Sequence, residues 1–232
     1  MENLADGLLW YFAFILSVVV HEGSHALAAL KLGDRTAYEG GQVTIDPLPH
    51  IKRSPVGTIV VPILSYVFSG FMMGWASAPY DPDWARRHPD RSALMSLAGP
   101  LSNLLLVILC GLLIRLGLAF DFFYAPDSIN FSHITAAVND GLPVGIARLL
   151  SIMFSLNLIL FCFNLLPLPP LDGSGIIPLF LSRERAVRYL DFIQNTPFMF
   201  LGLLFAWKVF GHLYSPIHLI FINLVYPGAG YH

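Results

Sequence analysis

The chain has 232 residues, of which 56% are hydrophobic and 12% are charged. A soluble domain has about 45–50% apolar and about 25% charged residues, so this composition excludes an ordinary soluble protein and indicates a membrane protein. The net charge of −2 gives no indication of a nucleic acid partner.

Three apolar segments are long enough to cross a bilayer as helices, which takes about 20 residues. They cover residues 7–32, 93–119 and 143–167. The first lacks a basic start and a small-residue cleavage site, so we expect it to be retained rather than removed as a signal peptide. The predicted fold class is an all-α polytopic membrane protein with three core transmembrane helices.

Two segments between the first and second spans predict a more irregular path. Residues 39–49, EGGQVTIDPLP, alternate β-branched and polar residues after two glycines, which predicts a short strand or hairpin. Residues 56–76 are apolar but are interrupted by a proline and two glycines. Residues 75–92 mix aromatic residues, prolines and arginines, as expected of an interfacial loop.

The C-terminal part predicts a surface helix and further apolar segments. Residues 182–195 are amphipathic and are expected to lie on the membrane surface. Residues 197–211 and 213–226 are apolar but short. The connections leave no room for a soluble accessory domain, so we expect one integral membrane domain over 1–232, with its core at 7–180 and the C-terminal segments at 181–232.

A metal-binding motif lies inside the first apolar span. His21, Glu22 and His25 form the pattern H-E-x-x-H. Positions i and i+4 share one helix face, so both imidazoles can bind one metal ion, and the glutamate beside them can take a proton from a water molecule. Histidines that only bond neighbouring helices are the alternative, but titratable groups are costly in an apolar span unless they are paired or functional. The motif therefore predicts zinc.

A catalytic zinc ion needs a third protein ligand, and Asp172 is the best candidate. Most other carboxylates lie in loops, whereas Asp172 ends the sequence FNLLPLPPLD after the third span. The prolines make this stretch irregular, as expected of backbone that lines a cavity. The alternative is a solvated aspartate in a Pro-Gly turn.

These motifs together resemble the site-2 protease family of intramembrane zinc metalloproteases. The second motif, N-x-x-P-x-P-x-L-D-G, begins at Asn164, and LAGPLSN resembles the G-P-x-x-N element of the family. The segments GGQVTIDPLPHI and GWASAP resemble the small prokaryotic branch without PDZ or CBS domains, which implies a short re-entrant β-like hairpin near the site. The family resemblance implies that His21, His25 and Asp172 bind one zinc ion, that Glu22 activates water, and that Asn164 holds the substrate strand or stabilises the oxyanion.

The remaining polar residues have more than one reading. Asn103 is either a catalytic residue or an ordinary interhelical hydrogen-bonding group. Asn157 is expected to make a structural contact, and Arg148 to pair or to reach the membrane surface. The other histidines are expected to be solvated: His50, His88, His133, His212, His218 and His232.

The motifs can meet only if 56–76 turns back instead of crossing the membrane. His25 lies near the end of its span, Asn103 near the start of the next, and Asp172 after the third. Three crossings bring these ends to one side, whereas a fourth would separate them. Re-entrant backbone is tolerated where protein buries it, so we expect 56–76 to turn back.

The predicted function is hydrolysis of a peptide bond in or near a transmembrane segment of a membrane-protein substrate by a multi-pass enzyme. By resemblance, that enzyme lies in the lipid bilayer of a prokaryotic cell membrane. One alternative is a zinc or proton transporter, which also uses intramembrane histidine and aspartate. The other is a catalytically inactive scaffold of the same fold. The sequence leaves the substrate, the orientation and the oligomeric state open.

Overall fold

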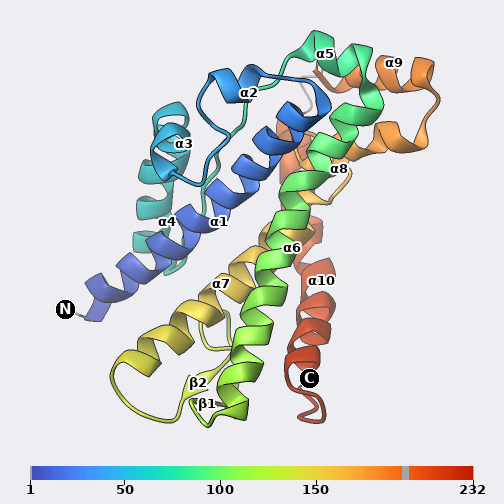
Figure 1. Ribbon diagram of the computed structural model, residues 1–232. Coiled ribbons are helices and arrows are strands. Elements are labelled where there is room, and N and C mark those ends of the chain that lie inside the picture. Colours follow the sequence, from blue (N-terminus) through green and yellow to red (C-terminus); the bar gives the residue numbers. More distant parts are fainter. Residues whose placement is uncertain (1, 195–198, 232) are drawn as a thin grey trace.

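The computed structural model describes residues 2–194 and 199–231, which form long helices with shorter helices between and beside them (Figure 1). Three helices are long and apolar enough to cross a membrane: α1 (Glu2–Leu32), α6 (Pro89–Ala119) and α7 (Leu142–Asn164). They correspond to the three predicted spans. The all-α, multi-pass fold class is therefore confirmed.

Local signals in the sequence set the ends of these helices. At the end of α1, Gly33 has a φ of 108°, and the N–H of Asp34 donates to the Ala29 carbonyl at 2.9 Å. This left-handed ending favours glycine because it lacks a Cβ. Helix α6 begins with a proline. Proline suits this position because the N–H groups of a first turn have no partner within the helix, so the N–H that proline lacks is not needed there. Both helix ends lie at the same end of the molecule (Figure 1).

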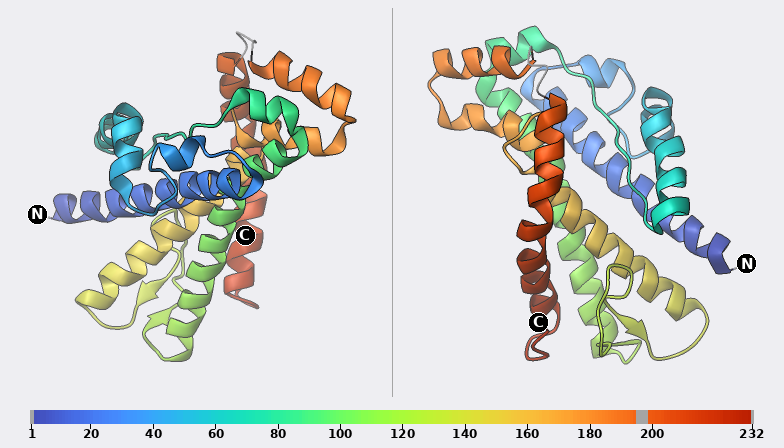
Figure 2. Two further views of the ribbon diagram at one scale, coloured as in Figure 1. Left: turned by 45° about the horizontal axis from the view of Figure 1, so that its top comes forward. Right: turned by 180° about the vertical axis from the view of Figure 1, so that it is seen from behind.

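The chain between α1 and α6 turns back, as predicted for 56–76. It forms α2 (Thr36–Glu39), α3 (Pro47–Arg53), a π-helix (Val56–Val60) and α4 (Val61–Ser69). The turn comes at Gly70, which has a φ of 76°, and an extended segment returns to α5 (Pro82–Arg87) (Figure 2).

A hydrogen bond joins the two ends of the segment 34–81, which leaves α1 and returns to it. The Asp34 carboxylate accepts from the N–H of Asp81 at 2.9 Å. At the far tip, the Tyr66 hydroxyl donates to Asp6 near the start of α1 at 2.8 Å, and Asp6 also pairs with Arg148, as expected for that arginine. The segment 34–81 therefore begins and ends beside the C-terminus of α1.

The predicted hairpin over 39–49 is wrong. Residues 41–46 form turns and bends, and the only sheet in the described residues joins β1 (Phe123–Tyr124) to β2 (Ala136–Ala137) between α6 and α7. Asp46 caps α3 by accepting from the Leu48 N–H at 2.9 Å, and Pro47 begins that helix. A helix cap and an N-terminal proline therefore outweigh four alternating residues that have no partner strand.

The C-terminal part contains α8 (Asp172–Ile176), a 3₁₀ helix (Ile177–Phe180), α9 (Arg183–Gln194) and α10 (Met199–Val225). Helix α9 matches the predicted amphipathic helix. Helix α10 joins the two predicted apolar segments into one helix, which packs against α6 and α7 (Figure 2). Residue 195 of the predicted amphipathic segment 182–195 and residues 197–198 of the predicted apolar segment 197–211 lie outside the described residues.

The main core lies where α1, α6, α7 and α10 meet. Its completely buried side chains include Phe14, Val107, Ile114, Ile152, Phe154, Leu158 and Ile222. Helix α6 also exposes leucines and isoleucines on its outer face, including Leu105, Leu112 and Leu116. A helix that is apolar on both its buried and its outer face fits a membrane span.

Two histidines differ most from the prediction that they are solvated, and a third, His88, is half-buried beside Trp84. His50 is completely buried, and its Nε2 lies 3.1 Å from the Thr44 carbonyl oxygen. His218 is half-buried and stacks on Tyr214 with ring centroids 5.2 Å apart. His50 and His218 pack inside the fold because α3 and α10 fold back onto neighbouring elements. His232 lies outside the described residues.

Candidate metal centre

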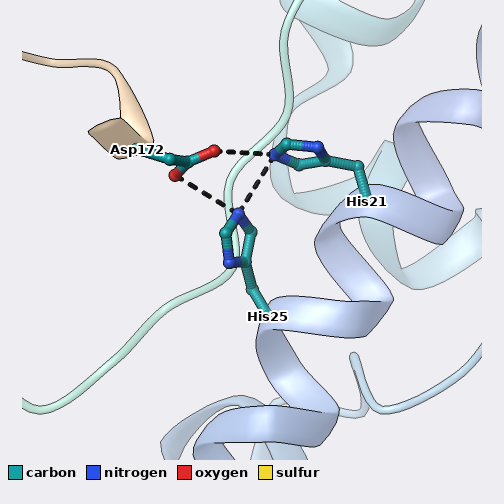
Figure 3. A group of neighbouring side chains, drawn as sticks. All are labelled: His21, His25 and Asp172. Carbon is teal, nitrogen blue, oxygen red and sulfur yellow. Dashed lines mark hydrogen bonds and ion pairs between the residues drawn. The ribbon is translucent and has the colours of Figure 1, made fainter. Parts of the chain in front are cut away.

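Helix α1 presents His21 and His25 one turn apart on the same face (Figure 3). Their Nε2 atoms are 3.0 Å apart, and both residues are buried. The i, i+4 spacing places both imidazoles on one side of the helix. The motif therefore has the local geometry that the sequence predicts.

Asp172 reaches the same point from the start of α8 (Figure 3). Its Oδ2 lies 3.0 Å from His21 Nε2, and its Oδ1 lies 3.3 Å from His25 Nε2. The structure thus brings together three residues that are far apart in the sequence. Among the described residues, they form the one group of histidine, cysteine or carboxylate side chains that could hold a metal ion.

The outer nitrogens of the two imidazoles establish which nitrogen of each ring carries the proton. His25 Nδ1 is 2.7 Å from the backbone oxygen of Met95. His21 Nδ1 is 2.6 Å from Oδ1 of Asn103. Because both oxygens only accept hydrogen bonds, each Nδ1 carries the hydrogen, and each neutral ring points the lone pair of Nε2 inward.

This donor set fits zinc. Two inward lone pairs and a carboxylate repel one another unless a cation lies between them. Zinc binds nitrogen at about 2.0–2.1 Å, which places tetrahedral ligand atoms about 3.3 Å apart. The ligand-atom distances of 3.0–3.3 Å are close to that value. The buried Oδ2 of Asp172 has no hydrogen-bond partner in the described chain, which also leaves it available to a metal.

Gly99 allows α6 to pack directly against His21 and His25. A Cβ atom at this position would lie 2.3 Å from His25 Nε2 and 2.6 Å from His21 Nε2. Both distances are shorter than any ordinary non-bonded contact. Any side chain at Gly99 would therefore occupy the space in which the metal would bind.

A cleft of about 290 Å³ opens beside the three candidate ligands. Glu22, His25 and Asp172 line it, together with the extended segment 76–80 and the α9 residues Leu190 and Ile193. Glu22 is only 8% exposed, and its carboxylate makes no hydrogen bond within the described chain. A carboxylate in this position can accept a proton from a water molecule in the cleft.

The two predicted catalytic asparagines lie in different places. Asn103 is completely buried, bonds His21 on the side away from the inward nitrogen, and also bonds Asn157. Asn164 is the last residue of α7 and is half-buried. In the described chain it neither lines the cleft nor makes a side-chain hydrogen bond. The structure therefore brings Asn103, but not Asn164, to the candidate ligands.

Sequence reasoning missed two contributors to this site. The Met95 contact uses a backbone oxygen, which gives no signal in residue types. Gly99 carries a signal, because a glycine before Pro100 near the start of a span indicates a close approach. The link from Asn103 to Asn157 is an interhelical bond of the kind expected for Asn157.

Comparisons with known proteins agree with this geometry. Residues 10–206 match the family model described as Peptidase family M50. A Bacillus subtilis (strain 168) protein named "Putative zinc metalloprotease YwhC" is 38% identical over 70% of the chain and 64% of its own length. A Mycobacterium tuberculosis (strain H37Rv) protein named "Putative zinc metalloprotease Rip2" is 31% identical over 83% of the chain and 64% of its own length. The chain thus spans less than two thirds of these relatives, and no solved structure matches it significantly.

Proposed function

Since the chain belongs to peptidase family M50, the site-2 proteases, we propose that it hydrolyses a peptide bond in or near a transmembrane segment of a membrane protein. One observation supports this most strongly: two imidazoles on α1, a helix able to span a membrane, converge beside Glu22 with a carboxylate from the start of α8. The enzyme would act as one integral membrane domain. Because its relatives come from bacteria, we place it in a bacterial cell membrane.

In this proposal His21, His25 and Asp172 hold one zinc ion. When bound, zinc supplies Lewis-acid polarisation of the scissile carbonyl and makes water easier to deprotonate. Glu22 accepts the proton of the attacking water and later delivers it to the leaving amine. Asn103 and the Met95 oxygen keep both imidazoles oriented, which makes Asn103 a positioning residue rather than one that touches substrate.

The cleft wall offers a place for an unwound substrate. A helical substrate hides its peptide groups in its own hydrogen bonds and must open locally before hydrolysis. In the described chain, the segment 76–80 has four N–H groups, since Pro79 lacks one, and none of the four donates a hydrogen bond, although the flanking N–H groups of Trp75 and Asp81 are both bonded. This extended segment could pair with an extended substrate by β-addition.

The three proposed ligands predict the metal content of the protein. Replacing His21, His25 or Asp172 with alanine removes one of three protein ligands, so zinc should be lost or greatly weakened in each variant. Elemental analysis of the purified proteins measures this, with about one zinc per chain expected in the parent. If the Asp172→Ala variant keeps full zinc and activity, its assignment as third ligand is wrong.

Asn164 is proposed to contact substrate rather than metal. Its half-buried amide has no partner in the described chain, and Pro167 and Pro169 make the following stretch irregular. The Asn164→Ala variant should therefore keep its zinc and cleave more slowly. Zinc content and cleavage rate measured on the same preparation check this, and cleavage at the parental rate would remove Asn164 from the site.

Co-expression with candidate single-span membrane proteins tests the proposed function and can identify a substrate. Cleavage should occur with the parent and disappear with Glu22→Gln. Two results would contradict the proposal. Zinc flux into liposomes, without cleavage, would favour the transporter. Neither cleavage nor flux from the purified parent against a broad substrate panel would favour the inactive scaffold.

A further inference from the structure

Asn157 in α7 belongs to a hydrogen-bonded chain that ends at the candidate metal centre. Starting from the proposed zinc function, we infer that Asn157 is a positioning residue. Its side chain sets the orientation of the Asn103 amide, which in turn sets which nitrogen of His21 carries the proton. Ser17, Asn103 and Asn157 are each completely buried, so water does not compete for these hydrogen bonds.

The series of hydrogen bonds begins at the backbone of α7, which fixes the orientation of the Asn157 amide. Asn157 Nδ2 lies 2.8 Å from the Met153 carbonyl oxygen and 2.8 Å from the Ser17 hydroxyl. A carbonyl oxygen only accepts hydrogen bonds, so the amide must present its nitrogen to Met153. Its oxygen therefore faces the other way, toward Asn103.

The orientation of Asn157 determines the orientation of Asn103, and Asn103 contacts His21. Asn157 Oδ1 accepts from Asn103 Nδ2 at 2.8 Å. The Ser17 carbonyl also faces Asn103 Nδ2, but at 3.4 Å, so Asn157 is the closer partner. With its nitrogen held in this way, Asn103 presents its oxygen to His21 Nδ1 at 2.6 Å. His21 then carries its hydrogen on Nδ1 and offers Nε2 to a metal.

Loss of the Asn157 side chain removes the stronger constraint on Asn103. The Asn103 amide can then rotate and present its nitrogen to His21 Nδ1. His21 would then change tautomer and carry its hydrogen on Nε2. That nitrogen would have no lone pair to offer to a metal. Mutation of such outer partners typically weakens metal binding about 10–100-fold, and we expect about tenfold for Asn157→Leu because the weaker Ser17 contact remains.

The experiment is a double-mutant cycle on the full chain in detergent, with zinc affinity measured by competition with a chromophoric chelator. The variants are Asn157→Leu, Asn103→Ala and the two combined. Asn157→Leu should weaken zinc binding about tenfold in the parent background and cause little further loss with Asn103→Ala present. A purely structural role would give the same loss in both backgrounds.

Ser151→Ala is the matched control on the same helix. Ser151 is completely buried and bonds the N–H groups of Ile134 and Thr135, away from the candidate ligands. This variant should lower thermal stability and leave zinc affinity unchanged. If Asn157→Leu does not fold, Asn157→Ser keeps a polar group too short to bridge Ser17 and Asn103, and enters the same cycle.

The outcomes separate this inference from the proposed function. Parental zinc affinity in the Asn157 variant, or equal losses in both backgrounds, would overturn the role of Asn157 while leaving the zinc centre in place. Absence of zinc binding by the parent would overturn the proposed function, and the inference with it.

Discussion

The Glu22→Gln protein should bind zinc as the parent does and cleave a membrane-spanning substrate about 10²–10⁴ times more slowly, the usual effect of losing a general base. Glu22 lines the cleft beside the proposed ligands but is not among them. Glutamine keeps the size of the side chain and removes its basicity. Zinc content and cleavage rate, measured on one preparation, separate metal binding from proton transfer.

Glu184→Gln provides the control for this experiment. Glu184 lies on α9 with its side chain 80% exposed and pairs only with Arg188 among the described residues. It should change neither zinc content nor rate. Cleavage by Glu22→Gln at the parental rate would show that the proposed hydrolytic mechanism is wrong, and loss of its zinc would show that Glu22 is part of the metal centre.

Gly99→Ala should remove zinc binding altogether, although it adds only one methyl group. The added Cβ would lie 2.3–2.6 Å from the two Nε2 atoms, in the space that a metal would occupy. Alanine favours helix more than glycine does, so the helix itself should not suffer. Zinc titration of the purified variant, with its helix content and unfolding temperature, measures both effects.

Gly111→Ala is the matched substitution on the same helix. A Cβ there meets Val225 at 3.4 Å and Phe154 at 3.6 Å, which are ordinary contacts. We expect this variant to keep its zinc and its activity. Parental zinc affinity in Gly99→Ala would mean that the metal does not lie between the histidines and α6.

The sequence predicted the features that depend on periodicity and residue type. The three spans follow from long apolar runs, and the paired imidazoles follow from the i, i+4 spacing of His21 and His25. The place of Asp172 after an irregular, proline-rich stretch makes it the best candidate for the third ligand, and its assignment as that ligand comes from the resemblance to the site-2 protease family. The turn back of 56–76 followed from geometry, because one more crossing would separate the candidate ligands.

Other features depend on contacts that residue types do not reveal. Four alternating residues predict a hairpin over 39–49, but Asp46 and Pro47 begin a helix, and no strand among the described residues lies beside the segment. The Met95 contact uses a backbone oxygen, and the direction of the Asn157–Asn103 bonds depends on which carbonyl each amide faces. These details become visible only when α1, α6 and α7 are packed together.

Cleavage by the purified chain in liposomes, measured as a function of added zinc, tests the central claim most directly. Protein stripped with a chelator and a membrane-spanning substrate identified by co-expression are the only proteins needed. We predict no cleavage without zinc, full recovery at about one equivalent per chain, and no recovery in the Asp172→Ala variant. Cleavage by the stripped protein, or no cleavage by the zinc-loaded parent, would contradict the account.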